Sequence, residues 1–361
     1  MNKIIKYGRA ELAYKSKEQL AQKPILRNLF WETTLKCNAN CLHCGSRAGA
    51  NVDCKDELTT DEIKNAFKVV AEKHDVSNVV INVTGGEPLL RKDLFDVMEY
   101  AVGLGYQWVI TTNGIMMTDK VISEFNRLKL GGVSLSIDGL SETHNAFRRF
   151  SNAYEKTMEN IVKLKDSGYE GLLMITTVVH KKNIDELEDL YKIVKDLGAH
   201  IWRIGNMDPI GRALENDDLS LDKVDYKRVL DFVKEKRKQG DTFINWGCTH
   251  YLGIDYEQEV RELPFNCVAG TTTASILYNG DIYVCPNVER RPELVQGNVR
   301  KDNFIDVWNN KFEWFRNMDK FKCEECSKCS DWKYCLGDSL HTWDFDNNRP
   351  RLCINKMLNE K

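Results

Sequence analysis

The chain has 361 residues, a length that accommodates about two domains and a substantial core. Its 51 basic and 54 acidic residues nearly cancel and are mixed along the chain, so neither a nucleic acid nor an anionic membrane surface is an expected partner. No apolar run reaches the roughly 18 residues that a membrane span needs, and the charged first residues are unlike a signal peptide. We therefore expect a soluble, cytoplasmic protein.

The first two thirds of the chain alternate β-rich runs with amphipathic stretches of helical period. Such alternation is typical of parallel strands that are joined by crossover helices. The helix that begins at Thr59 carries a capping box, formed by Thr59 and Glu62. Six strand–helix units predict an α/β fold, a partial (β/α)6 TIM-like barrel rather than a closed barrel of eight units. We expect the strands at residues 29–34, 78–84, 107–112, 132–137, 171–179 and 201–206.

The rest of the chain predicts a second, smaller unit. We expect the barrel to cover residues 25–215 and a charged linker helix to lie within residues 216–240. Residues 241–361 are rich in cysteine and turn residues and show little periodicity. A small C-terminal cysteine-rich domain is the expected result.

The twelve cysteines fall into two groups along the chain. Four lie near the start, none lies between residues 55 and 247, and eight follow from Cys248 onward. Because a reducing cytoplasm keeps thiols from forming disulfides, metal or cluster ligation is the leading interpretation. Cys54 lies apart from the tight spacing of its neighbours, and we expect it to be a buried or idle thiol.

Three cysteines form one short loop after the first predicted strand, in the order Cys37-x3-Cys41-x2-Cys44. Reactive groups of parallel α/β proteins gather at this end of the sheet. A cubane iron–sulfur cluster normally takes four cysteines, so three ligands leave one iron open. That iron can chelate the amino and carboxylate groups of S-adenosylmethionine (SAM). A structural zinc site with His43 as the fourth ligand is the alternative for this loop.

The loop resembles the signature of the radical SAM superfamily, and the resemblance extends over almost the whole chain. It implies a [4Fe-4S] cluster on the three cysteines and reductive cleavage of SAM to methionine and a 5'-deoxyadenosyl radical. That radical abstracts hydrogen from a substrate held at the barrel mouth. The same resemblance implies a set of SAM-contacting residues, namely His43, Gly85, Gly86, Glu87, Pro88, Ser136, Asp138 and Arg148.

Each of these residues has an implied place beside SAM. By the resemblance, His43 is the aromatic residue against the cofactor, and the Gly-Gly-Glu-Pro motif at residues 85–88 contacts the methionine amino group. Ser136 and Asp138 are candidates near the ribose, and Arg148 is a candidate for the SAM carboxylate. Taken singly, the glycine motif also suits an ordinary turn, and the last three residues also suit strand-end or surface roles.

The second cysteine group resembles the SPASM extension of radical SAM enzymes that modify peptides and proteins. The resemblance implies two auxiliary [4Fe-4S] clusters. The cluster nearer the active site would use Cys267 and Cys285. The farther cluster would be held completely, by Cys326, Cys329, Cys335 and Cys353.

The sequence departs from the SPASM pattern at Ser339, where the family has a cysteine four residues after Cys335. Cys248 and Cys323 are spare thiols that are candidates for the vacant ligand position of the nearer cluster. An open iron is the other alternative. A zinc ribbon is the alternative for the whole region.

By the same resemblance we expect a peptide or protein substrate, matured by crosslinking, thioether formation, epimerisation or oxidation, and an electron donor of the flavodoxin or ferredoxin type. A sulfatase-maturing enzyme is disfavoured, because Pro286 follows Cys285 where such maturases carry a catalytic aspartate. A small-molecule enzyme acting on a tetrapyrrole or a sugar is a further alternative, as is a zinc-stabilised binding protein without catalysis. The sequence assigns no catalytic side chain.

Overall fold

The computed structural model describes residues 3–241 and 243–359, and a ten-stranded sheet runs through them in the order β10-β9-β8-β1-β2-β3-β4-β5-β6-β7. From β1 to β6, neighbouring strands are parallel and follow the order of the chain. This arrangement confirms the predicted partial barrel. The six strands are β1 (Asn28–Glu32), β2 (Val80–Thr84), β3 (Gln107–Thr112), β4 (Gly132–Ser136), β5 (Leu172–Val179) and β6 (Ile201–Asn206).

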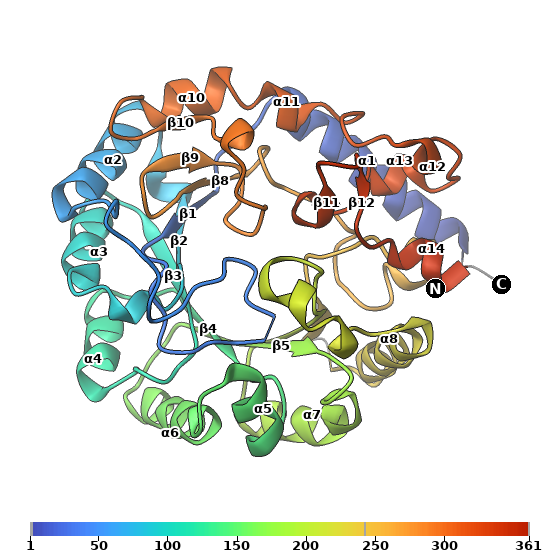
Figure 1. The fold of residues 1–361 in the computed structure, drawn as a ribbon, viewed down its shortest axis with the longest axis horizontal. Helices are drawn as coiled ribbons and strands as arrows, with labels where there is room; N and C mark the ends of the chain where they lie inside the picture. The colour runs from blue at the N-terminus through green and yellow to red at the C-terminus, as the bar shows by residue number, and fades with distance from the viewer. Residues whose placement is uncertain (1–2, 242, 360–361) are drawn as a thin grey trace.

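Helices form an outer ring around these strands (Figure 1). In α2, the buried Ile63, Phe67 and Val70 recur at helical spacing and face the sheet. The predicted capping box is present at its start, where the Thr59 and Glu62 side chains each bond the other's backbone N–H. The ring consists of α2 (Thr60–Lys73), α3 (Leu94–Gly103), α4 (Asp119–Arg127), α5 (Ser141–Arg148), α6 (Ala153–Asp166), α7 (Leu187–Asp196) and α8 (Lys223–Lys238).

The C-terminal region continues the barrel sheet at both of its edges. β7 (Ile244–Trp246) pairs in parallel with β6, and β8 (Thr273–Ile276) pairs in parallel with β1. β9 (Asp281–Tyr283) and β10 (Gly297–Asn298) follow in antiparallel pairing. The expected boundary at residue 241 therefore lies within one continuous sheet, because the edge strands of a partial barrel have backbone groups left to pair.

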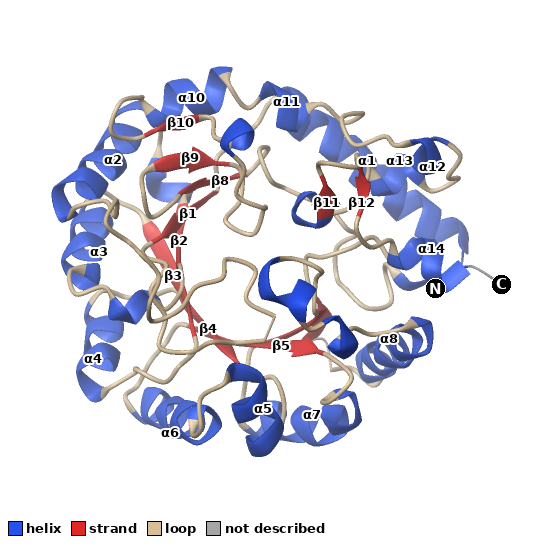
Figure 2. Cartoon of the chain, in the orientation of Figure 1, coloured by secondary structure: helices blue, strands red, loops and turns tan. Residues whose placement is uncertain are grey.

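The main hydrophobic core contains residues from Leu26 to Ile354 and joins the two regions. Loops and short helical segments lie inside the curve of strands (Figure 2). The remaining C-terminal elements are α9 (Gly253–Tyr256), α10 (Phe304–Asn310), α11 (Glu313–Arg316), α12 (Glu324–Ser327), α13 (Trp332–Cys335), α14 (Ile354–Asn359), β11 (Trp343–Asp344) and β12 (Arg349–Pro350). Short 3-10 helices are η1 (Val76–Asn78), η2 (Pro88–Leu90), η3 (Ile184–Glu186), η4 (Gly211–Glu215), η5 (Asp217–Leu219), η6 (Pro292–Leu294) and η7 (Leu340–Thr342).

The N-terminal helix α1 (Lys3–Gln22) was not expected from the sequence. It lies beside the C-terminal helices α9 and α13, far from its neighbours in sequence (Figure 1). Its buried side chains are Lys6, Ala10 and Lys17, so it has no apolar stripe that would have predicted it. Among the described residues, no helix is both long and apolar enough to cross a membrane.

Candidate active site

A cavity of about 360 Å³ opens at the carboxyl ends of the parallel strands. Many segments that are distant in sequence contribute to its wall, because the loops after parallel strands meet at one edge of the sheet. Most of the SAM-site residues expected from the sequence line it: Cys37, Cys41, His43, Cys44, Gly85, Gly86, Ser136 and Arg148. The structure therefore brings together eight of the eleven side chains or backbones expected in the barrel, and the three that lie outside are Glu87, Pro88 and Asp138.

Backbone hydrogen bonds, rather than the thiols, hold the cysteine loop in place. The Arg212 guanidinium donates from Nε to the Cys41 carbonyl (2.8 Å) and from Nη1 to the Ala48 carbonyl (2.9 Å). At the end of α5, the Phe147 carbonyl accepts from the Leu42 N–H (3.0 Å). The shape of the loop therefore does not depend on the thiols alone, and all three cysteines line the cavity.

Burial favours the protonated thiol at two cysteines of this loop, Cys37 and Cys41. It raises the pKa of Cys37 to about 12 and also raises the pKa of Cys41. Thiolates are the form that binds iron, so cluster assembly must release these protons.

The glycines of the second loop allow it to pack against the cysteine loop. A Cβ atom on Gly86 would lie 2.3 Å from the Lys36 carbonyl oxygen, and one on Gly85 would lie 2.6 Å from the Thr34 carbonyl oxygen. Gly85 also has a φ of +148°, which side chains rarely adopt. The Gly86 N–H donates to the Thr34 carbonyl (2.7 Å). We expected these glycines to let a ligand approach; they also let two backbones approach each other.

Glu87 and Pro88 lie behind the cavity wall and not in it. The fully buried Glu87 carboxylate accepts hydrogen bonds from the Thr112 hydroxyl (2.7 Å) and the Asn113 N–H (2.9 Å). Asn113 in turn donates from Nδ2 to Asn38 in the cysteine loop (2.7 Å). Glu87 therefore positions the cavity wall, and Pro88 begins the short helix η2.

Asp138 is also buried, and it holds Arg148 instead of facing the cavity. One carboxylate oxygen accepts the Val178 N–H (2.8 Å), and the other accepts from Arg148 Nε (2.6 Å). Burial alone would raise the pKa of Asp138, but the Arg148 guanidinium outweighs it and keeps the pKa below its ordinary value. Arg148 Nη1 lies 3.7 Å from Cys41 Sγ, so the ion pair reaches the cysteine loop.

His43 stands in an aromatic stack at the cavity. Its ring lies parallel to Phe147, with ring centres 4.8 Å apart, and Phe147 stacks on His180. Burial lowers the pKa of His43 to about 3, so the ring is neutral at physiological pH. Its Nδ1 atom is buried and has no partner among the described residues, which leaves a polar atom available to a bound group.

A carboxylate–histidine network on the opposite wall was not identified from the sequence. Asp208 Oδ2 lies 3.0 Å from His341 Nε2, and Asp208 Oδ1 lies 2.8 Å from His250 Nε2. Asp208 and His341 line the cavity. Burial alone would lower the pKa of His250, but Asp338 and Asp208 raise it to about 10. The position of Asp208 just after a predicted strand was the one available sequence signal.

The eight C-terminal cysteines separate into two sets in space. Cys248, Cys267 and Cys285 form the first: burial is the main cause that raises the pKa of Cys285 to about 12, and the neighbouring Cys267 and Cys248 add to it. The second set surrounds a cavity of about 880 Å³ and consists of Cys326, Cys329, Cys335 and Cys353.

The two spare cysteines lie with different sets. Cys323 belongs beside the second set, where its sulfur accepts the Cys326 N–H (3.5 Å). Cys248 lies with the first set, close to Ser339, whose hydroxyl accepts the His250 N–H (3.1 Å). Cys54 lines neither cavity and lies near the Thr34 hydroxyl. Across residues 3–241 and 243–359, no three His, Cys, Asp or Glu side chains converge on a point for a single metal ion.

Comparison with known proteins identifies the barrel. The model of the Radical SAM superfamily matches residues 31–194, and that of the SPASM iron-sulfur cluster-binding domain matches residues 267–330. The chain is 30% identical, over 86% of its length and 90% of the other protein, to an AdoMet-dependent heme synthase of Methanosarcina barkeri. The chain belongs to the radical SAM superfamily.

Other radical SAM proteins resemble it in sequence or in fold. The mycofactocin maturase MftC of Mycolicibacterium smegmatis is 27% identical over 86% of this chain and 77% of that protein. Among solved structures, anSMEcpe with bound AdoMet superimposes with a TM-score of 0.70 at 21% identity, covering 89% of this chain and 87% of that one. Streptococcus suis SuiB bound to S-adenosylmethionine gives 0.68 at 17% identity, covering 87% and 73%.

This radical SAM enzyme binds SAM and a [4Fe-4S] cluster, and the cavity fits both. The cysteine loop offers three thiols, which matches a cluster with one open iron. His43 and the glycine loop line the same space. When bound, cluster and SAM supply a carbon-centred radical. Cys37, Cys41 and Cys44 would hold the cluster, while Glu87 and Asp138 keep the surrounding loops in place.

Proposed function

We propose that this radical SAM enzyme modifies a peptide or protein substrate. The observation that carries the proposal is a second cavity, also of about 360 Å³, beside the SAM cavity. The two share wall residues, including Gly45, Ile210 and Pro286, so the space continues from the cysteine loop to the surface. An elongated space of this kind suits an extended chain that presents one residue to the radical.

The charges around this second cavity are already paired. Arg47 pairs with Glu215, Arg290 with Glu32, and Arg351 with Glu289 at 2.9 Å. A tetrapyrrole substrate carries several carboxylates, which favour arginines without an internal partner. A peptide chain is mostly neutral, so it needs no such cations. The named activity of the mycofactocin maturase supports the same class of substrate.

A tetrapyrrole is the second candidate substrate, because three relatives that are 30–32% identical are named heme synthases. Sulfatase maturation is less favoured. Pro286 does line the cavity, as expected of the residue after Cys285, and so provides no carboxylate at that position. We therefore rank a peptide first and a tetrapyrrole second.

The test uses the anaerobically reconstituted chain with SAM and a reductant. We expect a perdeuterated peptide encoded beside this gene to change mass and to transfer deuterium to 5'-deoxyadenosine. Iron-coproporphyrin serves as the competing substrate, and the variant with Cys37, Cys41 and Cys44 replaced by alanine serves as the control. Conversion of the porphyrin, with every neighbouring peptide unchanged, would contradict the proposal.

We also propose two auxiliary [4Fe-4S] clusters in the C-terminal region. Cys326, Cys329, Cys335 and Cys353 surround one cavity and would hold the farther cluster. The nearer cluster would have three cysteine ligands, Cys248, Cys267 and Cys285. Its fourth iron would be open, because Cys323 lies beside the farther set. A flavodoxin or ferredoxin type of donor would supply electrons, and we place the enzyme in the cytoplasm, where such donors and reduced thiols occur.

Replacing Cys248 by alanine is expected to lower the iron content by up to about four atoms per chain, the content of one cluster. Its proximity to Cys267 and Cys285 is the reason. Cys323→Ala and Ser339→Ala should keep the full iron content. The Cys323 thiol lies beside the farther set, and the Ser339 hydroxyl is a poor ligand for a cluster iron. Iron and sulfide assays after reconstitution check this. Full iron in Cys248→Ala would show that this thiol is not a ligand.

A further inference from the structure

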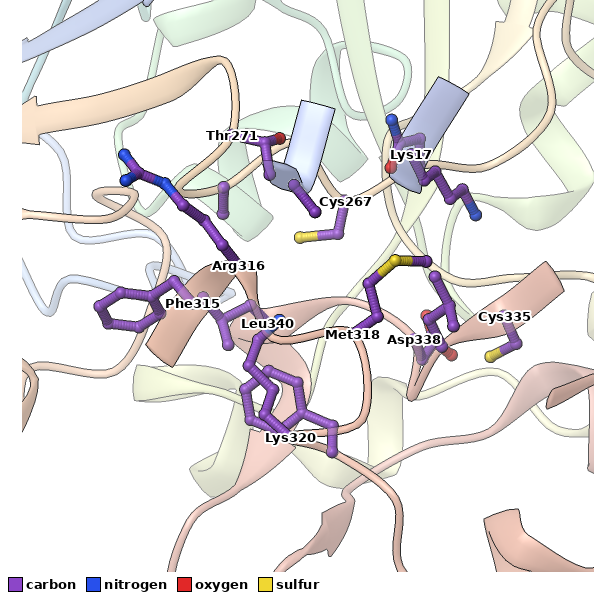
Figure 3. A pocket seen from close by; sticks show the side chains of 15 residues that line it. Lys17, Cys267, Thr271, Phe315, Arg316, Met318, Lys320, Cys335, Asp338 and Leu340 are labelled. Atoms are coloured by element: carbon purple, nitrogen blue, oxygen red, sulfur yellow. The ribbon is translucent and has the colours of Figure 1, made fainter. Parts of the chain in front are cut away.

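A small cavity of about 60 Å³ lies between the two sets of C-terminal cysteines. Cys267 of the first set and Cys335 of the second both line it, together with Lys17 of helix α1 (Figure 3). Lys17 therefore comes from the N-terminal helix and reaches the space between the two proposed auxiliary clusters. Neither the SAM site nor the proposed substrate space uses it.

Lys17 is a buried cation, with 7% of its surface exposed. Its Nζ donates to the Tyr334 carbonyl (2.7 Å) and lies 5.4 Å from the centre of the Phe265 ring. Among the residues that the structure describes, no carboxylate lies within ion-pair distance of Nζ. The buried Glu257, which acts on Lys17 electrostatically, is bonded by Arg261 at 3.2 Å and by the Phe265 N–H at 2.7 Å.

A buried ammonium group without a counter-ion is costly, because water no longer solvates its charge. Desolvation accordingly lowers the pKa of Lys17 to about 8, while negative charge on Cys335, Glu257 and Cys267 raises it. A cubane cluster with its thiolate ligands carries net negative charge, and its reduction adds another negative charge. Clusters on both sides of Lys17 would add negative charge to that of the Glu257 carboxylate.

We propose that Lys17 is a shared electrostatic element that raises the reduction potentials of both auxiliary clusters. This inference rests on the two auxiliary clusters of the proposed function. The physical reason is that a fixed positive charge stabilises the reduced, more negative cluster more than the oxidised one. In a buried site solvent screens that effect poorly. Lys17 is a positioning residue and does not contact the substrate.

Lys320 provides an internal comparison. It lines the same cavity, and Cys267 is the thiol whose negative charge raises its pKa. Burial lowers the pKa of Lys320 to about 8. Lys320 should therefore act on the nearer cluster alone, whereas Lys17 acts on both.

The test is a redox titration, monitored by EPR, of the reconstituted full chain. The chain carries alanine at residues 37, 41 and 44, so that only auxiliary clusters contribute to the EPR signal. The signal lost in Cys267→Ala identifies the nearer cluster. In Lys17→Met we expect both midpoint potentials to become more negative, and in Lys320→Met only that of the nearer cluster. Lys17→Arg should keep the original potentials, as should Lys15→Met, which changes an exposed lysine of the same helix.

Iron and sulfide are counted on each sample before titration. Full iron in Lys17→Met with both potentials unchanged would overturn the inference. If Lys17→Met loses iron, we titrate Lys17→Gln instead, because glutamine can still donate to the Tyr334 carbonyl. Unchanged potentials of both auxiliary clusters in Lys17→Gln would equally overturn the inference. An iron count for fewer than two auxiliary clusters, in the chain with an unsubstituted C-terminal region, would instead overturn the proposed cluster content. This count is made before any potential is measured.

Discussion

Replacing Cys37, Cys41 and Cys44 together by alanine is expected to abolish SAM cleavage while the chain stays folded. The three thiols face the cavity, and the loop that carries them is held by backbone hydrogen bonds from Arg212 and α5. Loss of the thiols therefore removes the ligands of the cluster, while the hydrogen bonds to the loop backbone remain. We expect about four fewer iron atoms per chain and 5'-deoxyadenosine at the background level.

Chromatography of 5'-deoxyadenosine and circular dichroism measure the two parts of this prediction. Cys54→Ala is the matched control, because this thiol lies close in sequence but outside the cavity. It should retain both iron and SAM cleavage. If the triple variant still forms 5'-deoxyadenosine, the cluster is not held by this loop.

Asp138→Ala is expected to lower the free energy of unfolding by about 3–5 kcal/mol, the cost of leaving a buried charge without its partner. Arg148 would lose the carboxylate that its guanidinium bonds, inside a region where Asp138 is fully buried. Because Arg148 Nη1 contacts Cys41 Sγ, the cysteine loop should loosen as well. Urea unfolding of the chain under anaerobic conditions measures the loss.

Asp138→Asn separates charge from shape in this prediction. It keeps the volume and one hydrogen-bond acceptor, so we expect a smaller loss of stability than in Asp138→Ala. Glu99→Ala is the surface control: Glu99 pairs with Arg127 at 2.6 Å, but both side chains are largely exposed, and little change is expected. Equal unfolding midpoints for Asp138→Ala and Glu99→Ala would refute a structural role for the buried pair.

The strands of the barrel followed from sequence because their patterns are local. Two of them, residues 107–112 and 201–206, begin and end where expected, and the other four differ by one or two residues at one or both ends. A buried parallel strand needs a run of apolar, β-branched side chains, and that requirement is visible without knowledge of the fold. The cysteine loop followed for a similar reason, since ligands of one iron–sulfur cluster lie close in sequence.

Residues whose role depends on distant partners did not follow in the same way. Asp138 was expected near a ligand, but it is buried against Arg148 and the backbone of β5. The glycine motif was expected to admit a ligand, and it also admits the backbone of the cysteine loop. In both cases the residue type was informative, whereas the neighbour that explains it lies tens of residues away.

The sequence by itself determined the partial barrel, the three-cysteine loop at its mouth and the presence of a second cysteine-rich region. These features depend on periodicity and on short spacings, which involve only residues that are close together in the sequence. Only the tertiary structure decided that β7 and β8 extend the barrel sheet, that Cys248 lies with Cys267 and Cys285, and that Lys17 reaches the space between the cysteine sets. Such contacts arise when one core buries segments far apart in the chain, and no local pattern records which segments will meet.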